Sequence, residues 1–184
     1  MVRNKLSLLK REISHYIGLP YSRNILKNGK IIKEQLLGGK GNWKDLKNET
    51  QKIAKKEKID LSKLNKQQLY NFQKKHHIGI DCSGLICQLL NFYFNSNLNP
   101  RKTSADMLTS SPISKKIINP NDLQTGDLVR QKNGRHALFI IDKQNDTISY
   151  VDSSFSGRGV KYGQADLANK SFIHQGFFRL FFLN

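Results

Sequence analysis

The chain has 184 residues, of which 38% are hydrophobic, and this length and composition suit one soluble domain with a buried core. Its 31 Lys and Arg residues outnumber its 14 Asp and Glu residues and leave a net charge of +17, which attracts anionic partners. Nucleic acid, an anionic membrane surface and a cell-wall polymer all fit this charge, and so does a lysine-rich solvated surface. Charge alone selects none of them.

The sequence contains no run of about 18 apolar residues, so we expect no membrane-spanning helix. The basic start of the chain is followed by Lys10, Arg11 and Glu12 instead of the uninterrupted apolar stretch of a secretory signal. We therefore expect no signal peptide. The location stays open between the cytoplasm and delivery by a phage or secretion route.

The first predicted element is an amphipathic helix over residues 3–17. Its apolar residues recur at three- and four-residue steps and share one face, as listing them shows: Leu6, Leu9, Ile13, Tyr16 and Ile17. Gly18 and Pro20 end this helix. Tyr21 leaves a proline-set turn, where it either packs in the core or points into a cleft.

Residues 25–77 differ in texture from the rest of the chain, because 40–77 holds eleven Lys and only four acidic residues. The run Gly38-Gly39-Lys40-Gly41-Asn42 predicts a flexible loop, followed by helices near 43–58 and 61–75, the second with Asp60 as N-cap. We interpret this stretch as a basic helical insertion in a single domain spanning 1–184. A solvated face explains its charge best, and nucleic acid is possible but not favoured, because no zinc-finger or recognition-helix pattern appears.

The run from Gly79 to Leu90 organises the chain. Apolar residues from Leu85 onward predict one buried stripe of a helix, which places Cys82 at the helix N-terminus. Unpaired N–H groups and the helix dipole favour negative charge there, so the thiolate of Cys82 is a candidate nucleophile. Cys87 lies within the stripe as a core residue. The two cysteines are five residues apart on one helix and cannot readily form a disulfide.

After this helix the pattern changes from helical to alternating. A turn at Asn99-Pro100 and a short helix ending near Leu108 come first. Strands are then predicted over 127–132, 136–142, 147–152, a short piece near Val160, and 172–183. Asn133-Gly134 suits a tight hairpin turn. Helices followed by a meandering sheet predict an α+β fold with an antiparallel sheet.

A cysteine peptidase needs an imidazole beside the thiolate and a third group that orients the imidazole. His136 is the best placed histidine, because it opens an apolar strand directly after a hairpin turn. The next strand runs back antiparallel and brings Asp152 beside it. His174 is a weak alternative in the last strand.

The remaining histidines, His15, His76 and His77, are expected to be surface groups. His76 and His77 together with the two cysteines match no closed zinc pattern. We therefore expect no metal and no cofactor.

Four blocks of the sequence, in this order, resemble the NlpC/P60 cysteine peptidases. They are Tyr16-Ile17-Gly18-Leu19-Pro20-Tyr21, Asp81-Cys82-Ser83-Gly84-Leu85, Arg101-Lys102-Thr103-Ser104-Ala105, and Thr125-Gly126-Asp127-Leu128-Val129 followed by His136. The blocks extend across most of the chain. The family connects the first two by a short link, where this chain has its insertion.

The resemblance implies a papain-like α+β fold and hydrolysis of an amide in peptidoglycan stem peptides, between γ-D-glutamate and the following diamino acid. Cys82 would be the nucleophile, His136 the general base and acid, and Asp152 the third site residue. Asp81 and Ser83 would line the pocket for the free amine of the substrate, and Tyr21 would border the site. The partner would then be peptidoglycan or another anionic wall polymer.

Two alternatives remain open. The first is a related thiol amidase or acyltransferase that acts on another substrate. The second is a catalytically idle basic module that binds or assembles within a phage-like particle.

Overall fold

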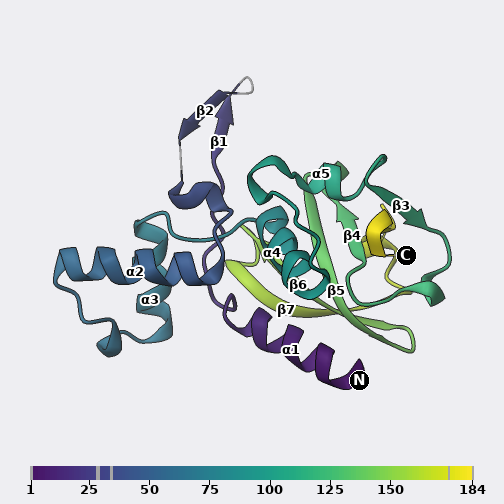
Figure 1. Cartoon of the computed structure of the whole chain (residues 1–184), viewed down its shortest axis with the longest axis horizontal. Helices are drawn as coiled ribbons and strands as arrows, with labels where there is room; N and C mark the ends of the chain where they lie inside the picture. The colour runs from purple at the N-terminus through teal and green to yellow at the C-terminus, as the bar shows by residue number, and fades with distance from the viewer. Residues whose placement is uncertain (1, 28–29, 34, 174, 184) are drawn as a thin grey trace.

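The computed structural model describes residues 2–27, 30–33, 35–173 and 175–183. Helices from the N-terminal half pack against a six-stranded antiparallel sheet from the C-terminal half, as Figure 1 shows. This α+β arrangement confirms the fold class predicted from the order of helical and alternating patterns. Among the described residues, no helix is both long and apolar enough to cross a membrane.

The helices of the N-terminal half begin and end close to where the sequence patterns do. The bounds are α1 (Val2–Ser14), α2 (Trp43–Glu57), α3 (Lys66–Lys75), α4 (Cys82–Phe94) and α5 (Ala105–Leu108). The expected helices over 3–17 and 43–58 are therefore confirmed.

The helix predicted over 61–75 begins later than expected. Asp60 caps a 3-10 helix at Leu61–Lys63 by accepting from the backbone N–H of Ser62. Asn65 caps α3 instead, because its side chain and that of Gln68 each accept from the other's backbone N–H in a capping box. The prediction of Asp60 as the cap of the long helix was wrong, because the nearer Asn65 supplies the stronger two-sided cap.

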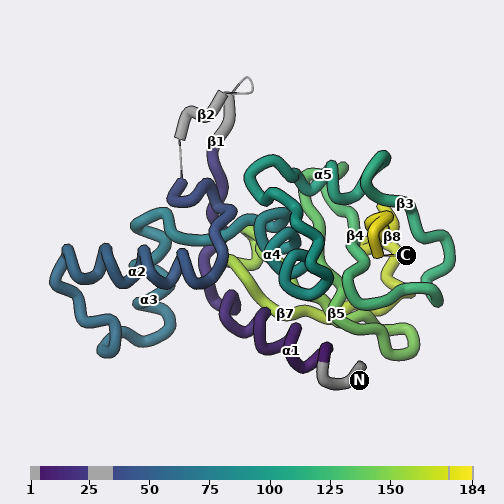
Figure 2. Tube along the Cα trace, in the orientation of Figure 1, coloured from purple at the N-terminus to yellow at the C-terminus, as the bar shows by residue number. Residues whose placement is uncertain are grey.

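The stretch 25–77 is also less purely helical than predicted. It contains the antiparallel hairpin of β1 (Ile25–Lys27) and β2 (Lys30–Lys33). Its two helices form an arm at the end of the molecule opposite the sheet edge that carries β3 (Figure 2). Leu46 of α2 is fully buried in the cluster that also holds residues of α1 and α4, so the arm is packed onto the body at its base.

The six-stranded sheet has the order β3-β8-β4-β5-β6-β7. Its strands are β3 (Ser114–Ile117), β4 (Leu128–Gln131), β5 (His136–Gln144), β6 (Thr147–Ser154), β7 (Gly159–Asp166) and β8 (Phe177–Leu180). The hairpin predicted at Asn133-Gly134 is present, since β4 and β5 pair antiparallel from Gln131 opposite His136. The short piece predicted near Val160 is the full strand β7.

Two parts of the sheet differ from the prediction. The stretch 172–183 is not one strand, because the short helix α6 (Lys170–Ile173) and a turn precede β8, and a 3-10 helix at Phe181–Leu183 follows it. The edge strand β3 was not predicted, since its sequence Ser-Lys-Lys-Ile has two exposed lysines and little β-forming character.

The core lies between α4 and one face of the sheet. Leu85, Ile86 and Leu89 of α4 are at most 1% exposed, and burial of each such side chain contributes about 1.5–3 kcal/mol. Alternate residues of β5 face opposite sides: Phe139 lies in the cluster with α4, and Ile140 lies in a second cluster on the other face. This packing holds the N-terminus of α4 against the start of β5.

Candidate active site

Cys82 is the first residue of α4, as predicted. Asp81 precedes it as N-cap, and its Oδ1 accepts from the backbone N–H of Gly84 at 2.7 Å. The N–H groups of the first helical turn have no partner within the helix, and the helix dipole favours negative charge there. Cys82 is buried, with 5% of its surface exposed, at the edge of a cleft.

His136 and Asp152 meet at the same place from neighbouring strands. His136 opens β5, and its Nε2 lies 2.9 Å from Oδ1 of Asp152 on β6. Both side chains are less than 10% exposed. The imidazole also forms a hydrogen bond with Cys82, and since Nε2 faces the carboxylate, Nδ1 is the nitrogen left for the thiol. The structure thus brings together the three residues that the sequence singled out.

The surroundings of His136 favour its charged form. Burial of the ring lowers its pKa, but the Asp152 carboxylate and Cys82 outweigh burial and raise the pKa to about 9. Near neutral pH the imidazole is therefore protonated.

A hydrogen bond joins the strand that carries Asp152 to the segment just before Cys82. The hydroxyl of Ser153, next to Asp152 on β6, donates to the backbone carbonyl of Ile80 at 2.6 Å, and Ser153 is fully buried. Ile80 lies two residues before Cys82. The strand that carries Asp152 is thus bonded directly to the segment that leads into Cys82.

Tyr21 lies beside the same segment. It forms an isolated parallel bridge with Ile80, and it lines the cleft together with Cys82. Burial and then the charge of Cys82 raise the pKa of the Tyr21 hydroxyl well above its ordinary value, so the phenol stays protonated. The structure therefore places Tyr21 at the border of the site, where the sequence resemblance put it.

Cys87 has a different environment, although it is only five residues further along α4. It is fully buried, and burial raises the pKa of its thiol to about 12. Both cysteines are free. Cys87 is thus a core residue, as predicted, and its thiol is neither charged nor accessible at neutral pH.

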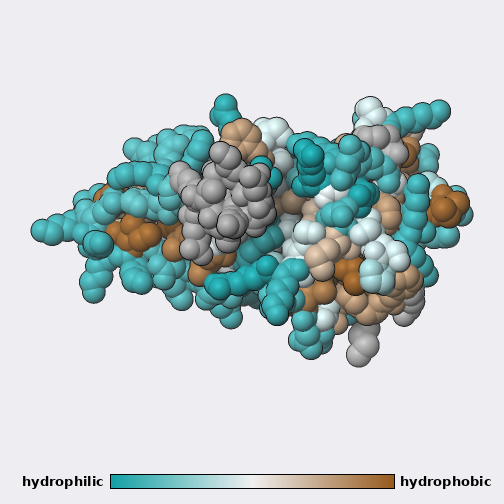
Figure 3. All heavy atoms as spheres, turned by 90° about the horizontal axis from the view of Figure 1, so that it is seen from above, coloured by the Kyte–Doolittle hydropathy of each residue, from teal (hydrophilic) through white to brown (hydrophobic). Residues whose placement is uncertain are grey.

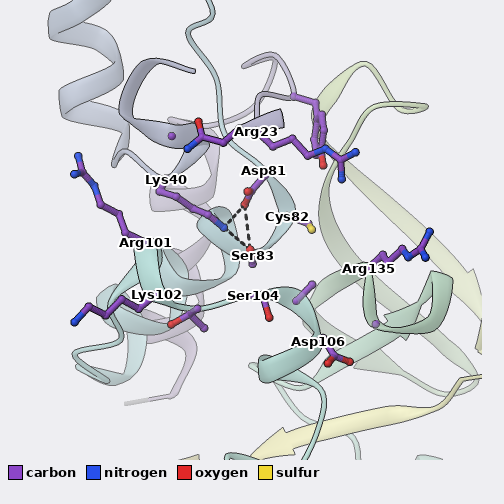
Figure 4. Close-up of a pocket in the computed structure, with 16 residues that line it drawn as sticks. Arg23, Lys40, Asp81, Cys82, Ser83, Arg101, Lys102, Ser104, Asp106 and Arg135 are labelled. Carbon is purple, nitrogen blue, oxygen red and sulfur yellow. Dashed lines mark hydrogen bonds and ion pairs between the residues drawn. The ribbon is translucent and has the colours of Figure 1, made fainter. Parts of the chain in front are cut away.

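A lysine that the sequence did not single out completes the cleft. Lys40 Nζ lies 2.8 Å from Asp81 Oδ1 and also donates to the hydroxyl of Ser83, as the dashed lines in Figure 4 show. The Lys40 and Asp81 side chains are only 15% and 12% exposed. Asp81 and Ser83 were expected to hold a substrate amine, and here an ammonium group of the chain itself lies on them.

The loop that carries Lys40 is held tightly against α4. The backbone N–H of Asp81 donates to the carbonyl of Gly39 at 2.9 Å, and the side chain of Gln88 donates to the carbonyl of Lys40 at 2.9 Å. Gly39 has a φ of +73°, and a Cβ there would lie 2.0 Å from the Ser22 carbonyl oxygen. The glycines therefore allow close backbone packing here, and the loop is not the loose connection that the sequence suggested.

The Thr125-Gly126-Asp127 block has a structural role. Asp127 is fully buried, and its two carboxylate oxygens accept from Nε and an Nη of Arg179 at 2.7 and 2.8 Å. The backbone N–H of Gly126 donates to the carbonyl of Ile140. The block anchors β4 to β5 and β8, the strands around His136.

The cleft beside Cys82 has a volume of about 1080 Å³. Three of the four matched blocks contribute lining residues, and the Thr125 block contributes none. Its charged lining residues are Arg23, Lys40, Asp81, Arg101, Lys102, Asp106 and Arg135. Seen from above, hydrophilic side chains cover most of the end formed by α2 and α3 (Figure 3). Among the described residues, no three His, Cys, Asp or Glu side chains converge as metal ligands.

The other histidines that the structure describes, His15, His76 and His77, lie outside the cleft lining. The exposed His15 stacks on Trp43 with 4.0 Å between ring centroids, and His77 is exposed. His76 is not the surface group that was expected, because its side chain is only 16% exposed and its Nε2 lies 3.2 Å from a carboxylate oxygen of Glu57 of α2. His174 lies outside the described residues.

Comparison of this chain with protein-family models, with curated proteins and with solved structures finds no match. The function is therefore inferred from the site itself.

Proposed function

We propose that this chain is a cysteine-type hydrolase with a papain-like fold of NlpC/P60 type. The observation that carries the proposal is the contact of Cys82 at a helix N-terminus with His136, whose far nitrogen lies 2.9 Å from Asp152. Thiolate, imidazolium and orienting carboxylate in this order form the set that acyl transfer to sulfur requires.

The first half of the reaction forms an acyl-enzyme. The Cys82 thiolate attacks the carbonyl carbon of the substrate amide and pushes the carbonyl electrons onto oxygen. The backbone N–H of Cys82, in the first turn of α4, would donate to that oxygen. The intermediate then collapses, the C–N bond breaks, and protonated His136 gives its proton to the departing amine.

The second half regenerates the thiol. Neutral His136 takes a proton from water, the hydroxide oxygen bonds to the thioester carbon, and the C–S bond breaks. The products are a carboxylic acid and the Cys82 thiolate, with the proton again on His136. Asp152 keeps the ring oriented throughout.

The substrate we propose is a short peptide of peptidoglycan stem type, cleaved between γ-D-glutamate and the following diamino acid. The support is the order of the four matched blocks and the position of Tyr21 at the cleft. The Lys40 ammonium on Asp81 and Ser83 favours a second candidate, a thiol amidase or acyltransferase with a different substrate. This candidate uses the same three residues and the same acyl-enzyme.

The test is hydrolysis of a defined stem tetrapeptide by the wild type and by Cys82→Ala, followed by mass spectrometry. We expect cleavage after γ-D-glutamate in the wild type, and a loss of at least about 10³-fold in the variant. Rapid alkylation of Cys82 without cleavage would move the proposal to the second candidate. A sluggish thiol and no cleavage would contradict both and leave a binding module.

A further inference from the structure

The cleft beside Cys82 contains positive charge that carries no ion pair with a carboxylate of the described residues. Of its two lining carboxylates, Asp81 is paired with Lys40, and Asp106 lies 2.6 Å from Arg130 outside the cleft lining. Four exposed cations remain: Arg23, Arg101, Lys102 and Arg135. Within the described parts of the chain, none of these four is ion-paired with a carboxylate.

These four cations lie on different sides of the cleft that Cys82 lines. In Figure 4, Arg101 and Lys102 lie on one side of Cys82 and Arg135 lies on the other. Arg135 directly precedes His136, and Arg23 forms a hydrogen bond with the Tyr21 hydroxyl. The charges are therefore distributed along the wall of the cleft and are not gathered at one distant rim.

Lys40 adds to the excess of positive charge in the cleft. The Asp81 carboxylate accepts from Lys40, from Ser83 and from the backbone N–H of Gly84, all at the same oxygen. A substrate ammonium would have to displace the Lys40 ammonium from that oxygen, and it would then face the four cations as well. A substrate carboxylate or phosphate meets a lining in which the cations outnumber the two carboxylates Asp81 and Asp106, and a net positive cleft raises the association of an anion about tenfold or more.

We infer that the cleft binds an acyl substrate that carries carboxylate or phosphate groups next to the bond attacked by Cys82. Arg23, Arg101, Lys102 and Arg135 bind these anions, and Lys40 occupies the position of a substrate ammonium. The reaction in this inference rests on the proposed function, but the anion preference can be measured without turnover.

The measurement compares alkylation of Cys82 by iodoacetate, which is anionic, with alkylation by neutral iodoacetamide. In both reactions the thiolate sulfur bonds to carbon and iodide leaves, and peptide mapping separates Cys82 from Cys87. The ratio of the two rates cancels the intrinsic reactivity of the thiol and reports the charge of the cleft.

The cleft variant combines Arg23→Gln, Arg101→Gln, Lys102→Gln and Arg135→Gln. The matched control combines Lys52→Gln, Lys55→Gln, Lys56→Gln and Lys63→Gln, which removes the same net charge from exposed positions on and beside α2. All eight side chains are exposed, so neither variant disturbs the core. Circular dichroism checks that both variants keep the wild-type fold.

We expect the iodoacetate-to-iodoacetamide ratio to fall about five- to tenfold in the cleft variant at low salt, and by less than twofold in the control. Salt should reduce the wild-type ratio toward that of the cleft variant. An unchanged ratio in the cleft variant would overturn the inference. An equal fall in both variants would also overturn it, because the overall charge would then be responsible.

Protection experiments identify the anion. Glutarate and inorganic phosphate are added separately at constant ionic strength while iodoacetamide alkylates Cys82. Protection by glutarate assigns the cleft to carboxylates, and protection by phosphate assigns it to phosphate groups. Protection no greater than that of sodium chloride, or protection by a DNA oligonucleotide alone, would contradict a small anionic substrate.

The two proposals fail in distinguishable ways. If stem peptides are not cleaved but the charge ratio behaves as expected, the proposed substrate is wrong and the anion site remains. If cleavage occurs and the ratio does not depend on the four cations, the anion site is wrong and the hydrolase remains.

Discussion

The cleft around Cys82 and the arm formed by α2 and α3 carry the same kinds of charged side chain in opposite surroundings. At the cleft, Lys40 and Asp81 lie 2.8 Å apart and are at most 15% exposed. On the arm, Lys52 and Glu49 lie 3.6 Å apart, and the lysine is 76% exposed. Water screens the exposed Lys52–Glu49 pair. In the largely buried Lys40–Asp81 pair, loss of either side chain leaves the other charge without a partner and with little water around it. The Lys40–Asp81 pair therefore depends on the exact positions of its two side chains. The exposed lysines of the arm contribute mainly to the net charge of the chain.

The largest effect that sharpens this comparison is expected from Asp152→Asn. Loss of the carboxylate removes the orientation of His136 and should lower kcat/KM about 10²- to 10³-fold on any substrate that the wild type turns over. It should also lower the pKa of His136 from about 9. The loss of activity that accompanies rising pH should therefore begin at a lower pH in the variant than in the wild type. A pH profile of kcat/KM measures both effects. The exposed Asp146→Asn serves as control, and an unchanged alkaline limb in Asp152→Asn would contradict the prediction.

The same raised pKa makes a statement about stability. A group whose pKa is higher in the folded state stabilises the fold fully below its unfolded pKa of about 6.5, and this contribution is lost as pH rises through about 9. The difference in unfolding free energy between wild type and Asp152→Asn should therefore be largest below about pH 6.5 and should narrow above pH 9. A difference that is constant with pH would show that the Asp152 carboxylate does not raise the pKa of His136.

Lys40→Met should have the next largest effect, because it leaves the Asp81 carboxylate without its ammonium partner in a nearly buried place. We expect the free energy of unfolding to fall by about 2 kcal/mol. Lys52→Met, on the exposed arm, should change it by less than about 0.5 kcal/mol. Urea denaturation of both variants measures the contrast, and equal values would mean that burial does not distinguish the two lysines.

Asn65→Ala should give the smallest effect and should confine it to the arm. The capping box at the start of α3 would be lost, which costs about 1 kcal/mol of stability. Gln67→Ala on the same helix removes only an exposed bond to Asn71 and should cost about 0.2–0.5 kcal/mol. The alkylation rate of Cys82 should stay the same in both variants. A slower rate in Asn65→Ala would show that the arm and the cleft are coupled.

The predictions that succeeded rest on local signals. The helix start at Cys82 was predicted from the apolar stripe that begins at Leu85, and the structure adds Asp81 as its N-cap; the hairpin at Asn133-Gly134 was predicted from turn chemistry. Asp152 was placed beside His136 because antiparallel neighbours meet in a known order. In each case, nearby residues determine the outcome.

Lys40 escaped prediction because its partner Asp81 is 41 residues away and the intervening arm hides the relation. Glycines around a lysine resemble a flexible loop in the sequence, but Gly39 and Gly84 allow two backbones to touch. A single lysine within a glycine run shortly after the Tyr21 block was the available signal. The split of 172–183 into helix, turn and strand was missed for a similar reason, since only tertiary packing distinguishes such an apolar stretch from one long strand.

The two cysteines of α4 also allow opening of the core to be measured by thiol labelling of the natural chain. Cys82 lines the open cleft, whereas Cys87, one and a half turns further along the same helix, is fully buried with a pKa of about 12. A native molecule should accept one thiol label, at Cys82. A molecule whose core has opened should accept two, at Cys82 and Cys87. The rate at which the second label is added, followed by mass spectrometry, then reports the rate at which the core opens and exposes Cys87. No dye or engineered reporter is needed.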